Sequence, residues 1–155
     1  MSTSTPSFLD LVDKMDLYLA KLQTVERDKI KETLKGLKGV YIFFEDEAPV
    51  YVGKTDNLVR RLSEHAREGS KNNDANFAFK IAKLEWLEQN NLEKKITRKF
   101  LEQLPDFGDT FKRAKSRVSN MTMKYVQIDD PYEQYLFEFF AALHFKSKYN
   151  DFKNH

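Results

Sequence analysis

The sequence contains no cysteine, and this absence excludes several classes of protein. Disulfide frameworks, zinc ribbons, thiolate clusters and cysteine nucleophiles all need the thiol group. Long apolar runs are missing too: none approaches the roughly 18 residues that a membrane-spanning helix needs. The segment Met1 to Ser7 is polar and uncharged, unlike a signal sequence. We therefore expect a soluble, cytoplasmic protein without a membrane partner.

The sequence also lacks a strong excess of charge of one sign. Its 26 lysines and arginines face 24 aspartates and glutamates, which leaves a net charge of +2. This balance is far from the strongly basic one that announces a nucleic-acid partner by itself, so such a partner must be argued from local patches. No internal repeat or low-complexity linker divides the 155 residues, and we expect a single domain.

Amphipathic helices are the commonest elements that the sequence predicts. Apolar residues recur at intervals of three and four over Phe8–Leu22, and a second helical stretch contains Val25, Ile30 and Leu34. The second helix is expected to end at Gly36, because glycine suits the left-handed position after a helix. Two further helices are predicted over Phe77–Leu87 and Leu92–Leu104, the last one stopping at the proline that follows.

A β-hairpin is predicted after the first two helices. The segments Val40–Phe44 and Val50–Gly53 are rich in β-branched and aromatic residues. They are joined by a loop of about four residues, and in that register Tyr41 lies opposite Tyr51, with both side chains on one face. With a third strand at Met121–Ile128, the predicted fold is α+β, a three-stranded antiparallel sheet flanked by helices.

The last predicted helix is almost wholly apolar. Asp130, Pro131 and Glu133 form a strong helix start, with a capping acid, a proline in the first turn and a capping-box glutamate. The helix continues to about Phe145, and its composition predicts that it is buried. Glu138 stands in its middle, and a buried carboxylate is costly unless it is paired or holds a metal. Glu138 therefore either has such a partner or points out of the core.

Two triplets and several single residues together form a recognisable pattern. The triplets are Gly39-Val40-Tyr41 and Tyr51-Val52-Gly53, and the single residues are Lys54, Arg61, His65, Glu138 and Asn150. This ordered set resembles the GIY-YIG nuclease family, with valine in place of isoleucine in the first triplet. The resemblance implies a core at 38–68 and 121–152, an N-terminal helical extension at 1–37 and a helical insertion at 69–120. Ser147 departs from the family, which often has proline there.

The resemblance implies a DNA endonuclease that hydrolyses phosphodiester bonds with one divalent ion. Glu138 is then the ligand of a Mg²⁺ or Mn²⁺ ion, because Mg²⁺ commonly keeps several waters beside a single carboxylate. Arg61 carries a fixed positive charge beside the scissile phosphate. Tyr41 is the general base, helped by Lys54, Arg61 or the metal, and Tyr51 orients the water or a phosphate. Either tyrosine could instead be a packed residue of the sheet.

The remaining candidates have supporting roles. His65 accepts a proton from Tyr41 or binds phosphate, although a structural histidine fits nearly as well. Asn150 cannot share the helix face of Glu138, because twelve straight helical residues span about 18 Å. We expect Asn150 to bond the hairpin backbone as a strut. Structural support of the site is thus expected from Gly39, Gly53 and Asn150.

DNA is expected to be held mainly through its phosphates. The insertion is the expected source of specificity or of a homodimer that cuts both strands. An alternative function is a non-catalytic nucleic-acid-binding or assembly module that retains the fold. The candidate phosphate contacts are Arg60, Arg61, Arg67, Lys71 and a basic cluster, Lys112, Arg113, Lys115 and Arg117, which could also be a solvated face.

Overall fold

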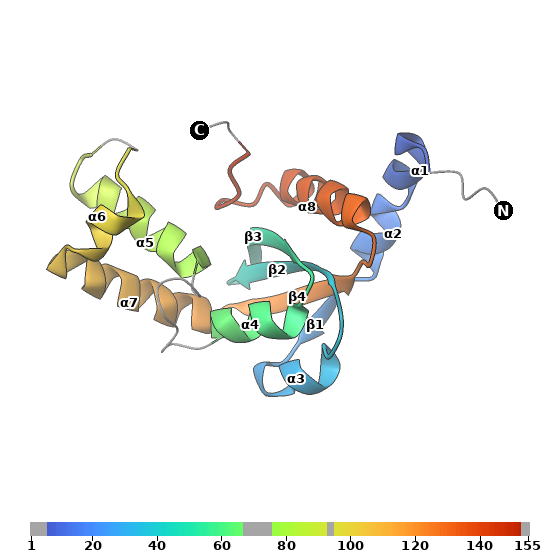
Figure 1. Cartoon of the computed structure of the whole chain (residues 1–155), viewed down its shortest axis with the longest axis horizontal. Coiled ribbons are helices and arrows are strands. Elements are labelled where there is room, and N and C mark those ends of the chain that lie inside the picture. Colours follow the sequence, from blue (N-terminus) through green and yellow to red (C-terminus); the bar gives the residue numbers. More distant parts are fainter. Residues whose placement is uncertain (1–5, 67–75, 93–94, 153–155) are drawn as a thin grey trace. The chain divides into compact units, whose positions relative to one another are not determined.

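The computed structural model describes residues 6–66, 76–92 and 95–152 (Figure 1). The chain divides into two compact units, one formed by Met1–Val59 with Thr122–His155 and the other by Arg60–Met121. Each unit is described by itself below. Within the described ranges, no helix has the length and apolar character needed to cross a membrane.

The first unit is built on a four-stranded antiparallel sheet with the order β1-β4-β2-β3. The strands are β1 (Gln23–Val25), β2 (Gly39–Glu45), β3 (Ala48–Thr55) and β4 (Thr122–Gln127). The α+β class is confirmed, but the expected number of three strands is wrong. The additional strand is β1, which pairs with β4 and includes Val25, a residue that we expected in a helix. Its three residues are too few to show an alternating pattern.

The β2–β3 hairpin has a tighter turn than expected. Asp46 and Glu47 form a two-residue turn with positive φ angles of 49° and 67°, as in a type I′ hairpin, so the expected four-residue loop is wrong. A bulge follows, because Phe44 pairs with Pro49 whereas Phe43 pairs with Tyr51. Without the bulge, Tyr51 would lie on the face opposite to Tyr41. The bulge therefore places both tyrosines on one face.

Short helices precede the hairpin. The single helix expected over Phe8–Leu22 is divided at Lys14, and the second expected helix begins only at Arg27, because Val25 belongs to β1. Gly36 follows with a φ of 75°, the predicted left-handed conformation. The observed elements are α1 (Phe8–Asp13), α2 (Met15–Ala20), η1 (Arg27–Lys29) and α3 (Ile30–Thr33).

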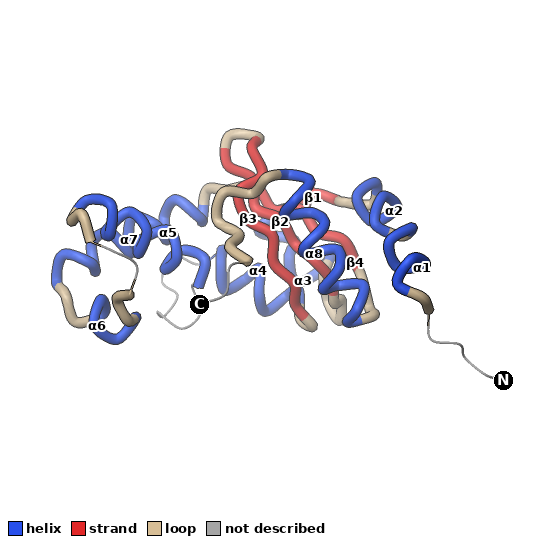
Figure 2. Tube along the Cα trace, turned by 90° about the horizontal axis from the view of Figure 1, so that it is seen from above, coloured by secondary structure: helices blue, strands red, loops and turns tan. Residues whose placement is uncertain are grey.

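Helix α8 (Pro131–Phe145) packs across one face of the sheet (Figure 2). Its Phe137 and Ala141 belong to one buried cluster with Val40, Ile42 and Val52 of the hairpin. The expectation that α8 is buried all round is wrong, because it covers the sheet with one side only. Four large side chains on its other sides are 48% to 72% exposed: Tyr132, Tyr135, Phe139 and Leu143.

The start of α8 anchors the N-terminal helices. Asp130 caps the helix as predicted, since its carboxylate accepts a hydrogen bond of 2.9 Å from the Glu133 backbone N–H. The buried side chain of Glu133 instead accepts hydrogen bonds from the Lys14 ammonium and the Tyr18 hydroxyl. Figure 1 shows α1 and α2 beside this end of α8. Burial and the Glu133 hydrogen bond raise the pKa of Tyr18, so its hydroxyl keeps its proton.

The second unit is helical over its described residues. Helix α4 (Leu58–Ala66) begins in the first unit and continues into the second. Helices α5 (Asn76–Gln89) and α7 (Pro105–Ser119) pack through the rings of Phe79, Phe107 and Phe111, and α6 (Arg98–Glu102) lies between them in the sequence. The helix expected to reach Leu104 ends at Glu102, and the following proline starts α7.

Candidate active site

The two tyrosines of the triplets lie together on the sheet face opposite α8. Their ring centroids are 6.3 Å apart, and Tyr41 also meets the ring of Phe43 edge-on. Tyr41 pairs across the hairpin with Gly53, so the expected pairing with Tyr51 is wrong, although the shared face is correct. A Cβ atom at Gly53 would lie 2.4 Å from the Tyr41 hydroxyl oxygen. The glycine therefore leaves the space that the buried Tyr41 ring occupies.

Glu138 lies beside Lys54 at the outer edge of β3, the edge at which Asn150 bonds Val52. Its half-buried carboxylate accepts a hydrogen bond from the Lys54 backbone N–H. Burial raises the pKa of Glu138, while the Lys54 ammonium and this hydrogen bond lower it, and burial has the larger effect. The carboxylate is thus only partly compensated by its protein surroundings. A group in this condition gains from any additional cation.

The C-terminal segment closes the exposed edge of β3. The Asn150 side chain accepts a 2.7 Å hydrogen bond from the Val52 N–H and donates a 2.8 Å bond to the Val52 carbonyl. The Tyr149 N–H donates to the Val50 carbonyl, and the Ser147 hydroxyl donates to the Asn150 side-chain oxygen. The hydrogen bonds expected of Asn150 to the hairpin backbone are therefore present. Ser147, at the position that departs from the family, contributes to holding Asn150.

Arg61 and His65 lie on α4, and both belong to the second unit. The Arg61 guanidinium is 3.3 Å from the Glu64 carboxylate, and its charge reaches His65, as their spacing on one helix face predicts. His65 is only 5% exposed and meets the ring of Phe77 edge-on. Burial, together with the charge of Arg61, lowers the pKa of His65 to about 3. At neutral pH it is uncharged and therefore cannot bind phosphate as a cation.

The low pKa of His65 makes stability depend on pH. An unfolded histidine titrates near pH 6.5, so as the pH falls the unfolded chain takes up this proton before the folded one does. The stabilisation that neutral His65 contributes is therefore complete above about pH 6.5 and is lost as the pH falls toward 3. We expect a loss of about 2 kcal/mol in unfolding free energy between about pH 7 and pH 5. The variant His65→Gln should lose less over this interval in urea titrations.

An exposed histidine gives the matched control for this prediction. His144→Gln makes the same replacement at an exposed position of α8 and so measures the effect of the substitution itself. Equal slopes for His65→Gln and the wild type would show that His65 is not the group that titrates.

The residues present fit a hydrated divalent ion better than a protein-enclosed one. Within the described part of the chain, no three side chains of histidine, cysteine, aspartate or glutamate converge on a common point. Glu138 offers one carboxylate of incompletely compensated charge. Mg²⁺ and similar ions bind in this way, with one or two carboxylates, substrate phosphates and several waters.

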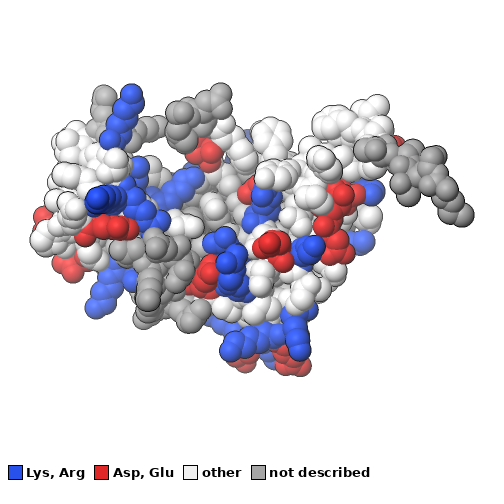
Figure 3. All heavy atoms as spheres, in the orientation of Figure 1, with Lys and Arg blue, Asp and Glu red and all other residues white. Residues whose placement is uncertain are grey.

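The candidate phosphate contacts are only partly available. Arg117 is paired with Glu85 at 2.9 Å, and the Lys115 ammonium lies over the Phe111 ring. Lys112 and Arg113 are exposed on α7, whereas Arg67 and Lys71 lie outside the described residues. Figure 3 shows basic side chains interspersed with acidic ones on the face in view.

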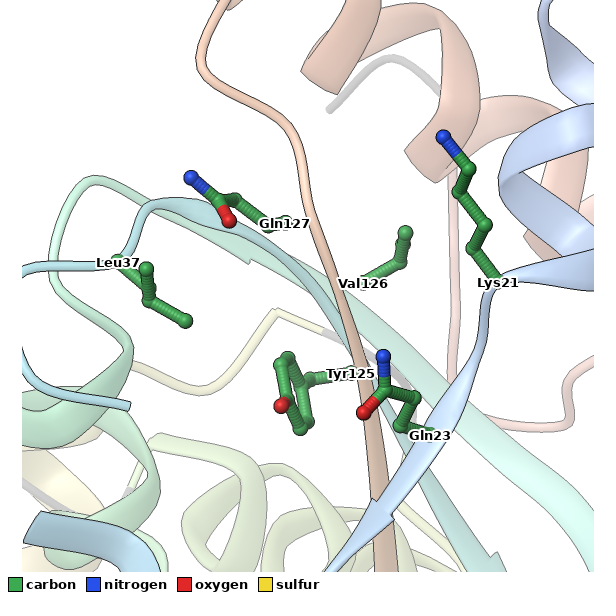
Figure 4. Close-up of a pocket in the computed structure, with 6 residues that line it drawn as sticks. All are labelled: Lys21, Gln23, Leu37, Tyr125, Val126 and Gln127. Carbon is green, nitrogen blue, oxygen red and sulfur yellow. The ribbon is translucent and has the colours of Figure 1, made fainter. Parts of the chain in front are cut away.

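A polar hollow at the β1–β4 edge was not anticipated from the sequence. Tyr125 is paired with both Tyr41 and Gln23, so its side chain shares the sheet face of the candidate tyrosine. Figure 4 shows Gln23 beside Tyr125, with Gln127 farther along β4. The sequence did contain one indication, because Tyr125 and Gln127 are polar residues at alternate positions of β4. The neighbouring strand β1 is too short to be predicted. The lining residues are Lys21, Gln23, Leu37, Tyr125, Val126 and Gln127.

Comparison with known proteins gives one family. Residues 37–104 match the model of the GIY-YIG catalytic domain. No curated protein and no solved structure matches the chain. The matched segment includes both triplets with Lys54, Arg61 and His65, and it ends before Glu138 and Asn150. A GIY-YIG domain is a nuclease fold, generally that of metal-dependent endonucleases. Residues 37–104 are therefore similar to the GIY-YIG catalytic domain, and this match confirms the family resemblance that the two triplets indicated.

Proposed function

We propose that this protein is a metal-dependent DNA endonuclease that uses one divalent ion. The observation that carries the proposal is the position of Glu138. This half-buried carboxylate is held against the backbone of Lys54, the residue directly after the second triplet, and burial raises its pKa. An unfavourable buried charge beside the hallmark motif of a nuclease domain is the arrangement expected of a metal ligand rather than of a packing residue.

Each candidate residue has a distinct role in the proposed reaction. Glu138 would hold the Mg²⁺ or Mn²⁺ ion, which when bound would stabilise charge at a phosphate oxygen and lower the pKa of bound water. Arg61 compensates the charge that develops on the phosphate, because a guanidinium stays protonated and offers paired donors. Tyr41 would take the proton of the attacking water as its phenolate, a form that positive charge from Lys54, Arg61 or the ion favours, and Tyr51 would orient that water. Asn150 keeps β3 aligned with α8.

His65 has a positioning role in this proposal. Its burial and its low pKa suit a neutral side chain that fixes the face of α4 on which Arg61 lies. DNA phosphates are contacted by exposed basic residues, among them Arg60, Lys112 and Arg113. Such contacts hold the duplex without reading its sequence.

Incubation with supercoiled plasmid tests the proposal. We expect nicked or linear product with Mg²⁺ or Mn²⁺ and intact plasmid with a chelator. Arg61→Ala should slow cleavage by about 100-fold or more, and Arg61→Lys by less, because a point charge replaces part of the guanidinium's function. Lys29→Ala, which removes an exposed charge paired with Glu26, is the matched control and should cut normally. A protein that binds DNA but cuts none with any metal would instead be the non-catalytic module.

A further inference from the structure

Tyr135 is an exposed aromatic residue directly beside the candidate metal ligand. It lies on α8 three positions before Glu138, and its side chain is 63% exposed. The Lys54 ammonium is 3.8 Å from the centre of its ring. The backbone N–H of the same lysine donates to Glu138. Ring, ammonium and carboxylate thus form one contiguous group.

This group has the components of a nucleotide subsite. A cation over an aromatic ring is a stable arrangement, so the ammonium is held near the ring while the rest of the ring remains open to solvent. Open aromatic rings stack against nucleobases whatever their identity, and a neighbouring lysine attracts the backbone phosphate. Lys54 connects both features to Glu138, since its ammonium lies over the Tyr135 ring and its backbone N–H bonds the Glu138 carboxylate. The site therefore has a place for the base next to the phosphate that is cut.

A ring in this position selects for bases that are free to stack. In an intact duplex, both faces of each base are covered by its neighbours, so the base must leave the stack to meet a protein side chain. We propose that Tyr135 and Lys54 form a stacking subsite for an unpaired nucleobase, and that the preferred substrate is DNA with unpaired nucleotides at the cleavage position. This inference rests on the proposed nuclease function.

The apolar surroundings of Tyr135 provide the competing explanation. Tyr132, Phe139 and Leu143 are also exposed on α8, and a stripe of this kind suits a second copy of the chain. An unpaired nucleobase and a second copy of the chain would depend on different residues of α8. A second copy would bury Leu143, which is 67% exposed and eight positions beyond Tyr135 on α8, whereas base stacking needs the Tyr135 ring. Leu143→Ser is therefore the matched control.

The experiment measures binding separately from cleavage. Fluorescence anisotropy in the presence of chelator compares a labelled single strand, a duplex with unpaired central bases and a fully paired duplex of the same length. Tyr135→Ala should weaken binding of the first two by about tenfold and that of the paired duplex by less than about twofold. Tyr135→Phe should bind like the wild type, because the ring is retained. Leu143→Ser should also bind like the wild type.

Three results would contradict the proposal that Tyr135 and Lys54 form a stacking subsite. These are equal losses on paired and unpaired DNA, no loss at all for Tyr135→Ala, or an equal loss for Leu143→Ser accompanied by dissociation of a dimer in light scattering. Because cleavage is not needed for this measurement, the two proposals fail separately. A wild-type protein that cuts nothing but shows the ring-dependent preference would retain the subsite and lose the nuclease function.

Discussion

Replacing Glu138 by glutamine is expected to abolish DNA cleavage while leaving the fold intact. We expect the rate of plasmid nicking to fall by at least about 100-fold, because an amide cannot replace a carboxylate as the ligand of a hard divalent ion. The fold should persist, since the amide has nearly the same shape and its oxygen still accepts the Lys54 N–H. Nicking assays and circular dichroism measure the two effects on the same preparation.

The raised pKa of Glu138 predicts a second measurable effect of this substitution, on the pH dependence of stability. Burial favours the protonated carboxyl, so the group stabilises the fold at low pH and this contribution is lost as the pH rises through the folded pKa. Glutamine does not titrate. As the pH rises from acidic to neutral, the wild type should therefore lose unfolding free energy that Glu138→Gln keeps. The difference between the variant and the wild type should shift in favour of the variant. Urea titrations at several pH values measure this difference.

Glu133 supplies the matched control on the same helix. It lies five positions before Glu138, and its buried carboxylate is paired with Lys14 and Tyr18. Glu133→Gln should lower the unfolding free energy, because the Tyr18 hydroxyl loses a charged acceptor at a buried position, whereas the half-exposed Lys14 ammonium remains hydrated. It should cut DNA normally at temperatures where it is folded. Normal cleavage by Glu138→Gln, or loss of cleavage by Glu133→Gln in the folded state, would contradict the assignment of the metal ligand.

The contrast between these two glutamates shows what could be predicted from the sequence. Glu138 was recognisable because a charge in the middle of an apolar helix is rare, and its spacing to Asn150 matched a family pattern. The role of Glu133 was missed, because its position suggested a capping box. Its actual partners, Lys14 and Tyr18, are more than a hundred positions away in the sequence, and no local pattern records such a contact.

The hairpin was predicted well and its register only in part. Alternation of apolar residues predicts which side chains share a face, and this was correct for Tyr41 and Tyr51. The pairing was wrong because a bulge and a two-residue turn with positive φ angles at Asp46 and Glu47 are not evident from these residue types. Likewise, the composition of α8 indicates its apolar character but not that only one side is covered. Whether the outer side of α8 is covered depends on whether another helix or sheet of the chain packs against it.

Replacing Gly53 by alanine is expected to inactivate the protein through a displacement of Tyr41. The added Cβ would lie 2.4 Å from both Cζ and the hydroxyl oxygen of Tyr41, so the ring must move. Because that ring is buried, we expect a loss of about 1 to 3 kcal/mol in unfolding free energy. Cleavage should fall by about 100-fold, since displacements of about 1 Å in a catalytic group have effects of this size.

Two other glycines make the comparison specific. Gly108 in α7 has no heavy atom within 4 Å of an added Cβ, and alanine favours a helix, so Gly108→Ala should stabilise the fold slightly and cut normally. A Cβ at Gly39 would lie 2.0 Å from the Val126 carbonyl oxygen, so Gly39→Ala should disrupt the pairing of β2 with β4 and lose stability and cleavage together. Only Gly53→Ala should lose far more cleavage than stability. If its loss of cleavage merely follows its loss of stability, as for Gly39→Ala, then Gly53 supports the sheet and the position of the Tyr41 hydroxyl is not critical for the reaction.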